Sequence, residues 1–305
     1  MMKVSVCIPV YNGAESIGPL VEEVFEYLNE SYETEIVLVN DCSPDNSHEV
    51  CKELAEKHEN LKYILLRRNY GEHNAVMCAL NHATGDYAAI IDDDFQNPPS
   101  EIVKLLEEAE KGYDVVYSEF EKKRHSLFRN LGSKFNDKVT NWLLEKPKDL
   151  YLSSFKVLNR DMIDEITRYT GPFPYVDGLV LRATNSISSV LVEHRERAVG
   201  TSNYTLKKLV RLWLSIFINF SIKPLRLFAL FGIVVTVLSF LASVAFIIEK
   251  LIFPDIQMGW TSLIVSILFF AGVQIVFLGL IGEYVGKHYL QSSGTPQWTI
   301  REKHL

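Results

Sequence analysis

Several features are scarce or missing in this chain of 305 residues, and each absence narrows the class of protein. It has four cysteines, with no CxxC pair and no metal-ligand spacing, so we expect reduced thiols, a cytosolic compartment and no disulfide framework. No GxGxxG or P-loop pattern occurs, which disfavours a dinucleotide oxidoreductase or an NTPase. A formal net charge of -7 disfavours a nucleic-acid-binding protein. Residues 1–10 lack a cleavage-like segment and predict a first strand, not a secretory signal. The cysteines are Cys7, Cys42, Cys51 and Cys78.

The first 120 residues alternate short apolar runs with amphipathic segments. Strands are expected at 4–9, 35–40, 61–66, 87–91 and 114–117, and helices at 16–30, 46–57, 72–82 and 100–110. This alternation predicts βαβ units and a mostly parallel sheet, with ligands received at the carboxyl ends of its strands. The candidate binding loops are therefore 10–15, 41–45, 67–73 and 92–97.

The most informative segment is 87–99, in which an apolar run ends in three consecutive carboxylates, Asp92, Asp93 and Asp94. On extended backbone, Asp92 and Asp94 would share one face with Gln96, and Asp93 would point elsewhere. Like charges at this spacing raise each other's pKa unless they share a cation. Such hard oxygen ligands suit Mg²⁺ or Mn²⁺. The segment predicts a metal site, and the alternative is a solvated acidic turn at a strand end.

The second half contains two long runs without a charged side chain, residues 227–248 and 260–282. As helices they would be about 33 Å long, close to the thickness of a bilayer core, so we predict two transmembrane helices. Cations flank the outer ends, and the positive-inside rule then places both the N-terminal domain and the tail in the cytoplasm. The alternative is a pair of buried helices in a soluble core. The flanking cations are Lys207, Lys208, Arg211, Lys223, Arg226, Lys287, Arg301 and Lys303.

Between these parts, residues 206–222 show apolar positions at helical spacing and a separate basic cluster. This composition predicts an interfacial helix lying among lipid headgroups. A helix packed on the soluble domain is the alternative.

Four motifs follow one another in the first hundred residues: Ile8–Asn12 with Glu15, Val39–Asp45, Arg68–Gly71 and Asp92–Pro99. Together they resemble the inverting family 2 glycosyltransferases, which have the GT-A fold, a Rossmann-like α/β architecture. Later motifs are similar to the polyprenyl-phosphate branch of that family, which includes dolichyl-phosphate mannose synthases, bactoprenol glucosyltransferases and undecaprenyl-phosphate aminoarabinose-type transferases. The chain most resembles the bacterial two-span members. These later motifs are Phe128-Arg129 with Ser133-Lys134, Ser154–Leu158, His194–Arg197 with Gly200, Ser202 and Tyr204, and Gly282–Gly286.

The resemblance implies a role for each matching residue at the donor site. Pro9, Tyr11, Asn12 and Glu15 would line the base and ribose, with the alternative that Pro9 and Tyr11 only shape the loop. Asp41 would bind the uracil or ribose edge, Asn69 and Gly71 would lie near the diphosphate, and Asp92 and Asp93 would contact the nucleotide. Asp94 and Gln96, with Asp92, would hold Mg²⁺ or Mn²⁺, which would neutralise charge on the leaving diphosphate. Asp92, Asp94 and Arg129 are the implied catalytic residues.

The implied acceptor, a polyprenyl phosphate, is already anionic at neutral pH and needs little general-base assistance. It needs cations and hydrogen-bond donors instead. Each candidate arginine could equally be a solvated surface residue. The candidates are Arg129, Ser133, Lys134, Arg195, Arg197 and Ser202.

The chain departs from the family pattern at three places. Asp93 stands where many relatives have a small residue, and Glu119 with Phe120 stands where an arginine is common. Asn203 replaces a frequent lysine, so Lys207 or Lys208 could contact the acceptor phosphate in its place.

The resemblance implies a metal-dependent enzyme that moves one sugar from a nucleotide diphosphate, expected to be UDP-linked, to undecaprenyl phosphate at the cytoplasmic membrane face. We expect a catalytic domain at 1–204, an interfacial helix at 205–223, a transmembrane hairpin at 224–284 and a cytoplasmic tail at 285–305. A homo-oligomer, as in tetrameric two-span relatives, is also implied. The alternatives are a processive polysaccharide synthase, whose Glu-Asp and QxxRW signatures are missing here, and a non-catalytic scaffold that binds nucleotide sugars.

Overall fold

The computed structural model describes residues 1–120, 150–193, 195, 223–252 and 259–305. The chain divides into two compact units, one made of Met1–Tyr204 with Gly294–Leu305 and the other of Thr205–Ser293.

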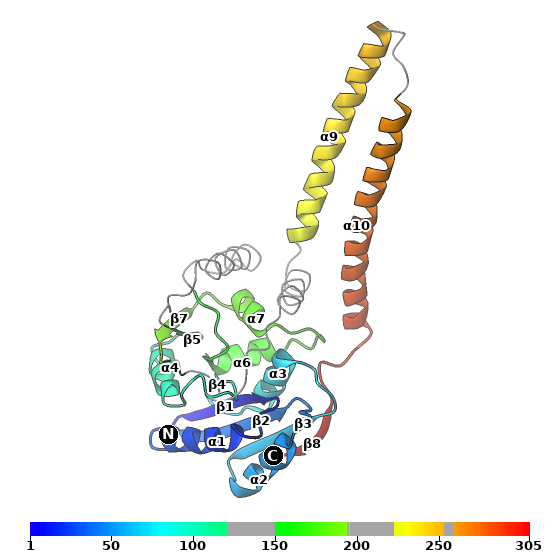
Figure 1. Ribbon diagram of the computed structural model, residues 1–305. Coiled ribbons are helices and arrows are strands. Elements are labelled where there is room, and N and C mark those ends of the chain that lie inside the picture. The colour runs from blue at the N-terminus through cyan, green and yellow to red at the C-terminus, as the bar shows by residue number, and fades with distance from the viewer. Residues whose placement is uncertain (121–149, 194, 196–222, 253–258) are drawn as a thin grey trace. The chain divides into compact units, whose positions relative to one another are not determined.

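The first unit is built on an eight-stranded sheet with the order β7-β5-β6-β4-β1-β2-β3-β8 (Figure 1). The strands β4, β1, β2 and β3 are parallel neighbours, whereas β6 runs antiparallel to β4 and β5, and β8 runs antiparallel to β3. The carboxyl ends of the four parallel strands therefore meet at one edge of the sheet. The strands are β1 Lys3–Val10, β2 Glu33–Asn40, β3 Leu61–Leu66, β4 Tyr87–Ile90, β5 Val115–Glu119, β6 Lys156–Asn159, β7 Ile187–Leu191 and β8 Ile300–His304.

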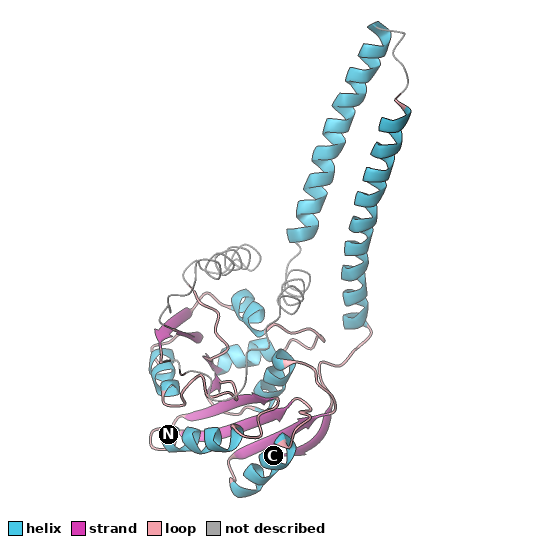
Figure 2. Ribbon diagram, viewed as in Figure 1, coloured by secondary structure: helices cyan, strands magenta, loops and turns pink. Residues whose placement is uncertain are grey.

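Helices cover both faces of this sheet, as the cyan and magenta elements of Figure 2 show. One apolar core joins α1, α2 and α4 to the sheet, and a second core joins α3, α6 and α7 to its other face. Successive residues of β2 contribute to opposite cores, Ile36 and Leu38 to the first and Val37 and Val39 to the second, because side chains alternate along a strand. The helices are α1 Ile17–Leu28, α2 Ser47–Lys57, α3 Glu72–His82, α4 Glu101–Ala109, α6 Arg160–Thr167 and α7 Val176–Ala183.

The predicted α/β class and the mostly parallel sheet are confirmed. The five strands and four helices expected in the first 120 residues all form, with end points within two residues of the predicted ones. The interaction of β6 with β4 and of β8 with β3 was not predicted. The sheet is thus wider than the βαβ pattern alone indicates.

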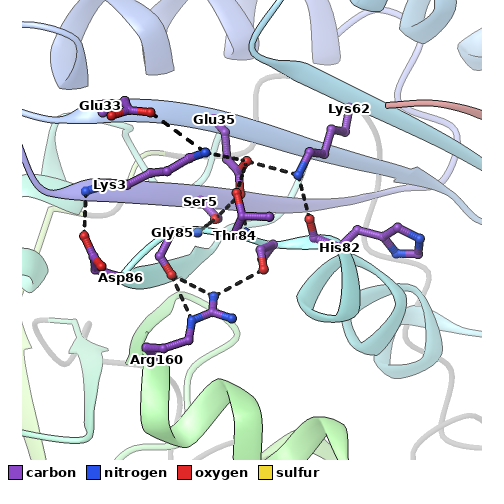
Figure 3. Close-up of polar contacts among 11 residues, drawn as sticks. Lys3, Ser5, Glu33, Glu35, Lys62, His82, Thr84, Gly85, Asp86 and Arg160 are labelled. Atoms are coloured by element: carbon purple, nitrogen blue, oxygen red, sulfur yellow. Dashed lines mark hydrogen bonds and ion pairs between the residues drawn. The ribbon is translucent and has the colours of Figure 1, made fainter.

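A buried carboxylate, Glu35, ties the amino ends of the parallel strands together (Figure 3). It accepts hydrogen bonds from Ser5 Oγ and from both the amide and the hydroxyl of Thr84. The ammonium groups of Lys62 and Lys3 lie 3.1 and 3.5 Å from its Oε2 atom. Burial raises the pKa of Glu35, but the hydrogen bonds from Ser5, Thr84 and Lys62 outweigh burial and lower it to about 2. This network lies at the opposite ends of the strands from the candidate binding loops.

The second unit contains the long helices α9, Lys223–Ile252, and α10, Trp260–Ser292. Their residue ranges include both predicted spans, 227–248 and 260–282. The rings of Phe228 on α9 and Phe277 on α10 pack edge to face at 4.9 Å between centroids. Among the residues that the structure describes, Phe269–Ser292 is long and apolar enough to cross a membrane, and Phe228–Ala242 is a shorter apolar helix. Two transmembrane helices therefore remain a prediction. The expected interfacial helix, 205–223, lies outside the described residues except for Lys223, which begins α9.

Candidate functional site

The loop after β1 lies against the loops after β2 and β4, and side chains of those loops hold its backbone. Tyr11 N donates to Asp93 Oδ2 at 3.0 Å, and Asn12 N donates to Ser43 Oγ at 3.2 Å. Asn12 has a φ of 60°, a left-handed conformation that asparagine tolerates better than most residues. The loops at the carboxyl ends of β1, β2 and β4 thus form one connected surface.

Asp41, the first residue after β2, is buried and holds the loop after β3. Its two carboxylate oxygens accept hydrogen bonds from Tyr70 N and Gly71 N, each at 2.7 Å. Burial raises the pKa of Asp41, and the two amide bonds counteract that rise. Gly71 has a φ of 92°, which only glycine adopts readily, so the paired amides depend on glycine at this position.

The acidic segment is a turn and not an extended strand, which corrects one premise of the sequence analysis. Strand β4 ends at Ile90, and Phe95 has a φ of 59°. The rule that alternate side chains share a face therefore does not apply to residues 92–94. The pairing of β4 ends at Ile90 on both sides, opposite Cys7 of β1 and Lys156 of β6.

Each of the three carboxylates in this turn accepts a hydrogen bond from a different part of the chain. Asp92 Oδ2 accepts from Ser154 Oγ at 2.6 Å, which links the turn to the segment before β6. Asp93 Oδ2 accepts from Tyr11 N, and Asp94 Oδ1 accepts from Gln96 N at 3.1 Å within the turn. The turn is consequently held from two sides.

Burial and mutual repulsion raise the pKa values of carboxyl groups in and beside this turn. Burial, with smaller contributions from Asp92 and Asp94, raises the pKa of Asp93 to about 7 even though the Tyr11 amide lowers it. The carboxyl group of Glu72, the first residue of α3, also has a raised pKa because nearby protein atoms desolvate it and Asp92 repels it. A cation placed here would relieve this repulsion.

The chemistry of these side chains fits a divalent ion that substrate phosphates help to hold. Among the described residues, no three histidine, cysteine, aspartate or glutamate side chains are grouped closely enough to bind a metal by themselves. Mg²⁺ and Mn²⁺ sites in nucleotide-dependent enzymes often use one or two carboxylates and complete their coordination with phosphate oxygens and water. The turn with Asp92, Asp94 and Gln96 offers such a partial set of hard oxygen atoms.

The other residues predicted to bind the donor lie in the same loops but differ in exposure. Pro9 is buried inside β1 opposite Val39, which suits the alternative that it shapes the loop. Tyr11 is 49% exposed, and Glu15 and Asn69 are exposed as well. Their contacts with a nucleotide remain predictions.

Most of the predicted acceptor residues fall outside the part of the chain that the structure describes. Arg129, Ser133, Lys134, Arg197 and Ser202 lie outside the described residues, as does Asn203. Arg195 is described.

Arg195 lies beside the acidic turn. Its amide donates to Gln96 O at 2.9 Å, and its guanidinium lies 3.6 Å from Glu23 Oε2 on α1. The departure from the family pattern at Glu119 and Phe120 is also described. Glu119 ends β5, and its carbonyl accepts a hydrogen bond from the Val192 amide at 2.9 Å. Phe120 packs edge to face on Tyr151.

The sequence analysis did not assign a role to a buried polar group behind the acidic turn. Lys156 on β6 forms an ion pair with Asp177 on α7, and Tyr117 OH donates to Asp177 Oδ1 at 3.0 Å. Burial lowers the pKa of His73 to about 4, so this ring is neutral at pH 7. The only signal in the sequence was a lysine within a short apolar strand, which does not identify its partner. Ser154 belongs to one of the motifs that carry the resemblance, but its bond to Asp92 depends on the antiparallel β6.

Two family models match this chain. One is described as glycosyl transferase family 2 and matches residues 5–167, and the other is described as the GtrB C-terminal hairpin and matches residues 223–287. Curated relatives named undecaprenyl-phosphate 4-deoxy-4-formamido-L-arabinose transferase, from Proteus mirabilis and Photorhabdus laumondii, are each 34% identical over 304 residues. The alignments cover 98% of this chain and 93% and 94% of the two relatives.

Solved structures with the same fold are more distant in sequence. Mannosyl-3-phosphoglycerate synthase from Rubrobacter xylanophilus has a TM-score of 0.55 at 18% identity and covers 70% of this chain and 71% of its own. Glucosyl-3-phosphoglycerate synthase from Mycobacterium tuberculosis, solved with Mn²⁺, UDP and phosphoglyceric acid, has a TM-score of 0.54 at 15% identity. That alignment covers 71% of this chain and 76% of the other. At these identities the likeness shows the fold alone.

Proposed function

Since this chain belongs to glycosyl transferase family 2, we propose that it transfers a single sugar from a nucleotide diphosphate donor, UDP-linked, to undecaprenyl phosphate at the cytoplasmic face of a membrane. Similarity to undecaprenyl-phosphate sugar transferases over 98% of the chain supports this acceptor class. The structural neighbour solved with Mn²⁺ and UDP supports a uridine nucleotide and a divalent ion.

The observation that carries the proposal is the contact between the acidic turn and the loop after β1. The bond from Tyr11 N to Asp93 brings the carboxylates beside the loops that follow β1 and β2, at the sheet edge where α/β folds bind nucleotides. Asp41 supports the neighbouring loop through Tyr70 and Gly71. A nucleotide over these loops would have its phosphates near the carboxylates.

The proposed reaction forms one bond and breaks one bond. A phosphate oxygen of the acceptor attacks the anomeric carbon, the bond from that carbon to the β-phosphate oxygen breaks, and the nucleoside diphosphate leaves with the electron pair. Attack from the face opposite the leaving group inverts the configuration. The acceptor oxygen carries negative charge at pH 7, so no side chain has to remove a proton.

In this proposal Asp92, Asp94 and Gln96 hold a divalent ion. When bound, the ion supplies Lewis-acid stabilisation of charge on the departing diphosphate. Tyr11 and its loop orient the base and ribose, and the loop that contains Asn69 and Gly71 lies along the diphosphate.

Membrane attachment would bring the site to the lipid acceptor. The apolar side chains of α9 and α10 include many that are more than half exposed, such as Leu230, Phe240 and Phe269. Side chains of this kind suit a hydrocarbon environment, and we propose that both helices span the bilayer with the first unit in the cytoplasm. Assembly into a homo-oligomer stays a prediction.

The test uses the full chain reconstituted in vesicles that contain undecaprenyl phosphate. Radiolabelled UDP and GDP sugars are supplied one at a time, with and without EDTA. We expect one sugar per lipid from at least one UDP donor, loss of transfer with EDTA, and recovery when Mn²⁺ or Mg²⁺ is added in excess. A polymeric product would favour the polysaccharide synthase, whereas nucleotide binding without transfer from any donor would favour the scaffold.

A further inference from the structure

The last strand of the sheet, β8, follows the second long helix in the chain and belongs to the first unit. It pairs antiparallel with β3, from Tyr63 opposite His304 to Leu66 opposite Ile300. Trp298 and Ile300 pack against the apolar core that contains α3. Without β8, the backbone groups of β3 along this edge would be unpaired.

Contacts from this segment go beyond the strand pairing and reach the loop after β3. Arg67 N donates to Thr299 O at 2.9 Å, and Arg67 Nε donates to Ile300 O at 3.1 Å. The hydroxyl groups of Tyr70 and Thr299 are hydrogen-bonded at 2.6 Å. The guanidinium of Arg68 lies 4.6 Å from the centre of the Tyr70 ring, so both the ring and the hydroxyl of Tyr70 are held.

The same tyrosine takes part in the Asp41 contact. Its amide donates to Asp41 Oδ1, and the following amide, that of Gly71, donates to Asp41 Oδ2. Thr299 thus holds the side-chain hydroxyl of Tyr70, and the backbone amide of Tyr70 is bonded to the buried carboxylate of Asp41. Asn74 Nδ2 donates to Tyr70 O at 2.7 Å, which fixes the start of α3 to the same residue.

We propose that Thr299 is a positioning residue for the nucleotide-sugar donor, because it fixes Tyr70 and thereby the loop after β3 that Asp41 also holds. This inference rests on the proposed function, in which that loop lies along the donor diphosphate. The chain segment that leaves the hairpin would then have two roles, closing the sheet edge and setting the geometry of the donor site.

The test compares Thr299→Val, Thr299→Ser and Tyr70→Phe in the reconstituted full chain. Removing one hydroxyl hydrogen bond should raise the donor KM and the Kd for UDP with Mn²⁺ roughly three- to tenfold. The KM for undecaprenyl phosphate should stay within about twofold of wild type, since the acceptor does not use this loop. Thr299→Ser, which keeps the hydroxyl, should restore wild-type values.

A double variant and a control separate positioning from general destabilisation. Thr299→Val with Tyr70→Phe should be no worse than either single variant, because both remove the same bond. Arg301→Ala changes an exposed residue of β8 and should leave all constants unchanged.

The inference is wrong if Thr299→Val leaves the donor KM and the nucleotide Kd unchanged. It is also wrong if serine does not rescue, or if donor and acceptor KM rise together with a lower melting temperature. If the wild type binds UDP but transfers no sugar, the proposed function fails, and the nucleotide Kd values still decide the role of Thr299. Wild-type protein that binds no nucleotide overturns both.

Discussion

Asp94 accepts a hydrogen bond from Gln96 N within the turn and is one of the proposed metal ligands. Asp92 and Asp93 are tied to the segment before β6 and to the loop after β1, so they support the fold of the site as well. We expect Asp94→Asn to reduce transfer roughly 10²- to 10³-fold, the usual cost of losing one electrostatic stabiliser of a leaving group.

The measurement is initial rate against Mn²⁺ concentration in vesicles. Asp161→Asn is the matched control, because Asp161 is an exposed carboxylate at the start of α6. Wild-type turnover by Asp94→Asn would contradict the metal-binding role.

Gly13 offers a second test at the residue scale. A Cβ atom at this position would lie 2.4 Å from Asp93 Oδ2 and 3.1 Å from Val10 Cγ1, so Gly13→Ala should displace the Asp93 carboxylate from Tyr11 N. Losing a hydrogen bond to a charged group costs about 1.5–3 kcal/mol, and part of that loss should weaken donor binding roughly tenfold.

Calorimetric titration with UDP and Mn²⁺ measures this effect. Gly18→Ala is the control, because nothing lies within 4 Å of its added Cβ and alanine favours the helix α1. Equal nucleotide affinity in both variants would show that the Tyr11–Asp93 contact does not matter for binding.

At the scale of elements, Glu35 connects β1, β2 and β3 with the turn before β4. Its pKa is about 2 in the folded chain and about 4.5 when exposed, which corresponds to about 3 kcal/mol of folding free energy. Because the folded pKa is the lower one, this stabilisation is present above pH 4.5 and is lost as the pH falls toward 2. About 2 kcal/mol of it should be lost by pH 3.

Glu35→Gln should thus lower the melting temperature of the detergent-solubilised chain strongly at pH 7 and less than half as much at pH 3. Glu33→Gln is the comparison, since Glu33 is 60% exposed at its side chain and lies 3.9 Å from Lys3. Surface pairs of this kind contribute little. A difference between wild type and Glu35→Gln that does not shrink on acidification would contradict the assignment.

The elements of the first 120 residues were predictable from their alternating apolar runs and amphipathic segments, and β8 was not. Helix α3 begins and ends at the predicted residues, Glu72 and His82, because Gly71 precedes it and apolar residues fill its buried face. Strand β8, Ile-Arg-Glu-Lys-His, has three charged residues and becomes a strand only because β3 offers an open edge.

Within the site, the sequence predicted which loops meet but not which partners their side chains contact. The loops after β1, β2 and β4 meet as predicted, because parallel strands end at one edge. The partners of Asp92 and Asp93 could not be inferred, since the backbone turns after Ile90 and the contact with Ser154 depends on an antiparallel strand from elsewhere in the chain.

At the scale of the whole molecule, the proposed membrane spans and lipid acceptor would make the bilayer a factor in the kinetics. If enzyme and acceptor meet in the plane of the membrane, the rate should depend on the mole fraction of undecaprenyl phosphate in the lipid. Adding carrier phospholipid at constant total acceptor should lower the rate about in proportion to the dilution. The dependence on the soluble sugar nucleotide should not change.

Initial rates in vesicles of increasing phospholipid content provide the measurement. A rate that follows only the total acceptor concentration would mean that the enzyme takes the lipid from solution. The exposed side chains of α9 and α10 would then need another explanation.

The position of β8 after both long helices also sets an order of synthesis. A ribosome makes β1 to β7 first, then α9 and α10, and only afterwards the strand that covers β3. The nascent sheet therefore has an open edge at β3 while the two helices are being made, a period when unpaired strands are prone to wrong associations. Completion of the sheet thus has to wait until α9 and α10 have been made, so a chain arrested before Ile300 would carry the acidic turn but lack the strand that pairs with β3.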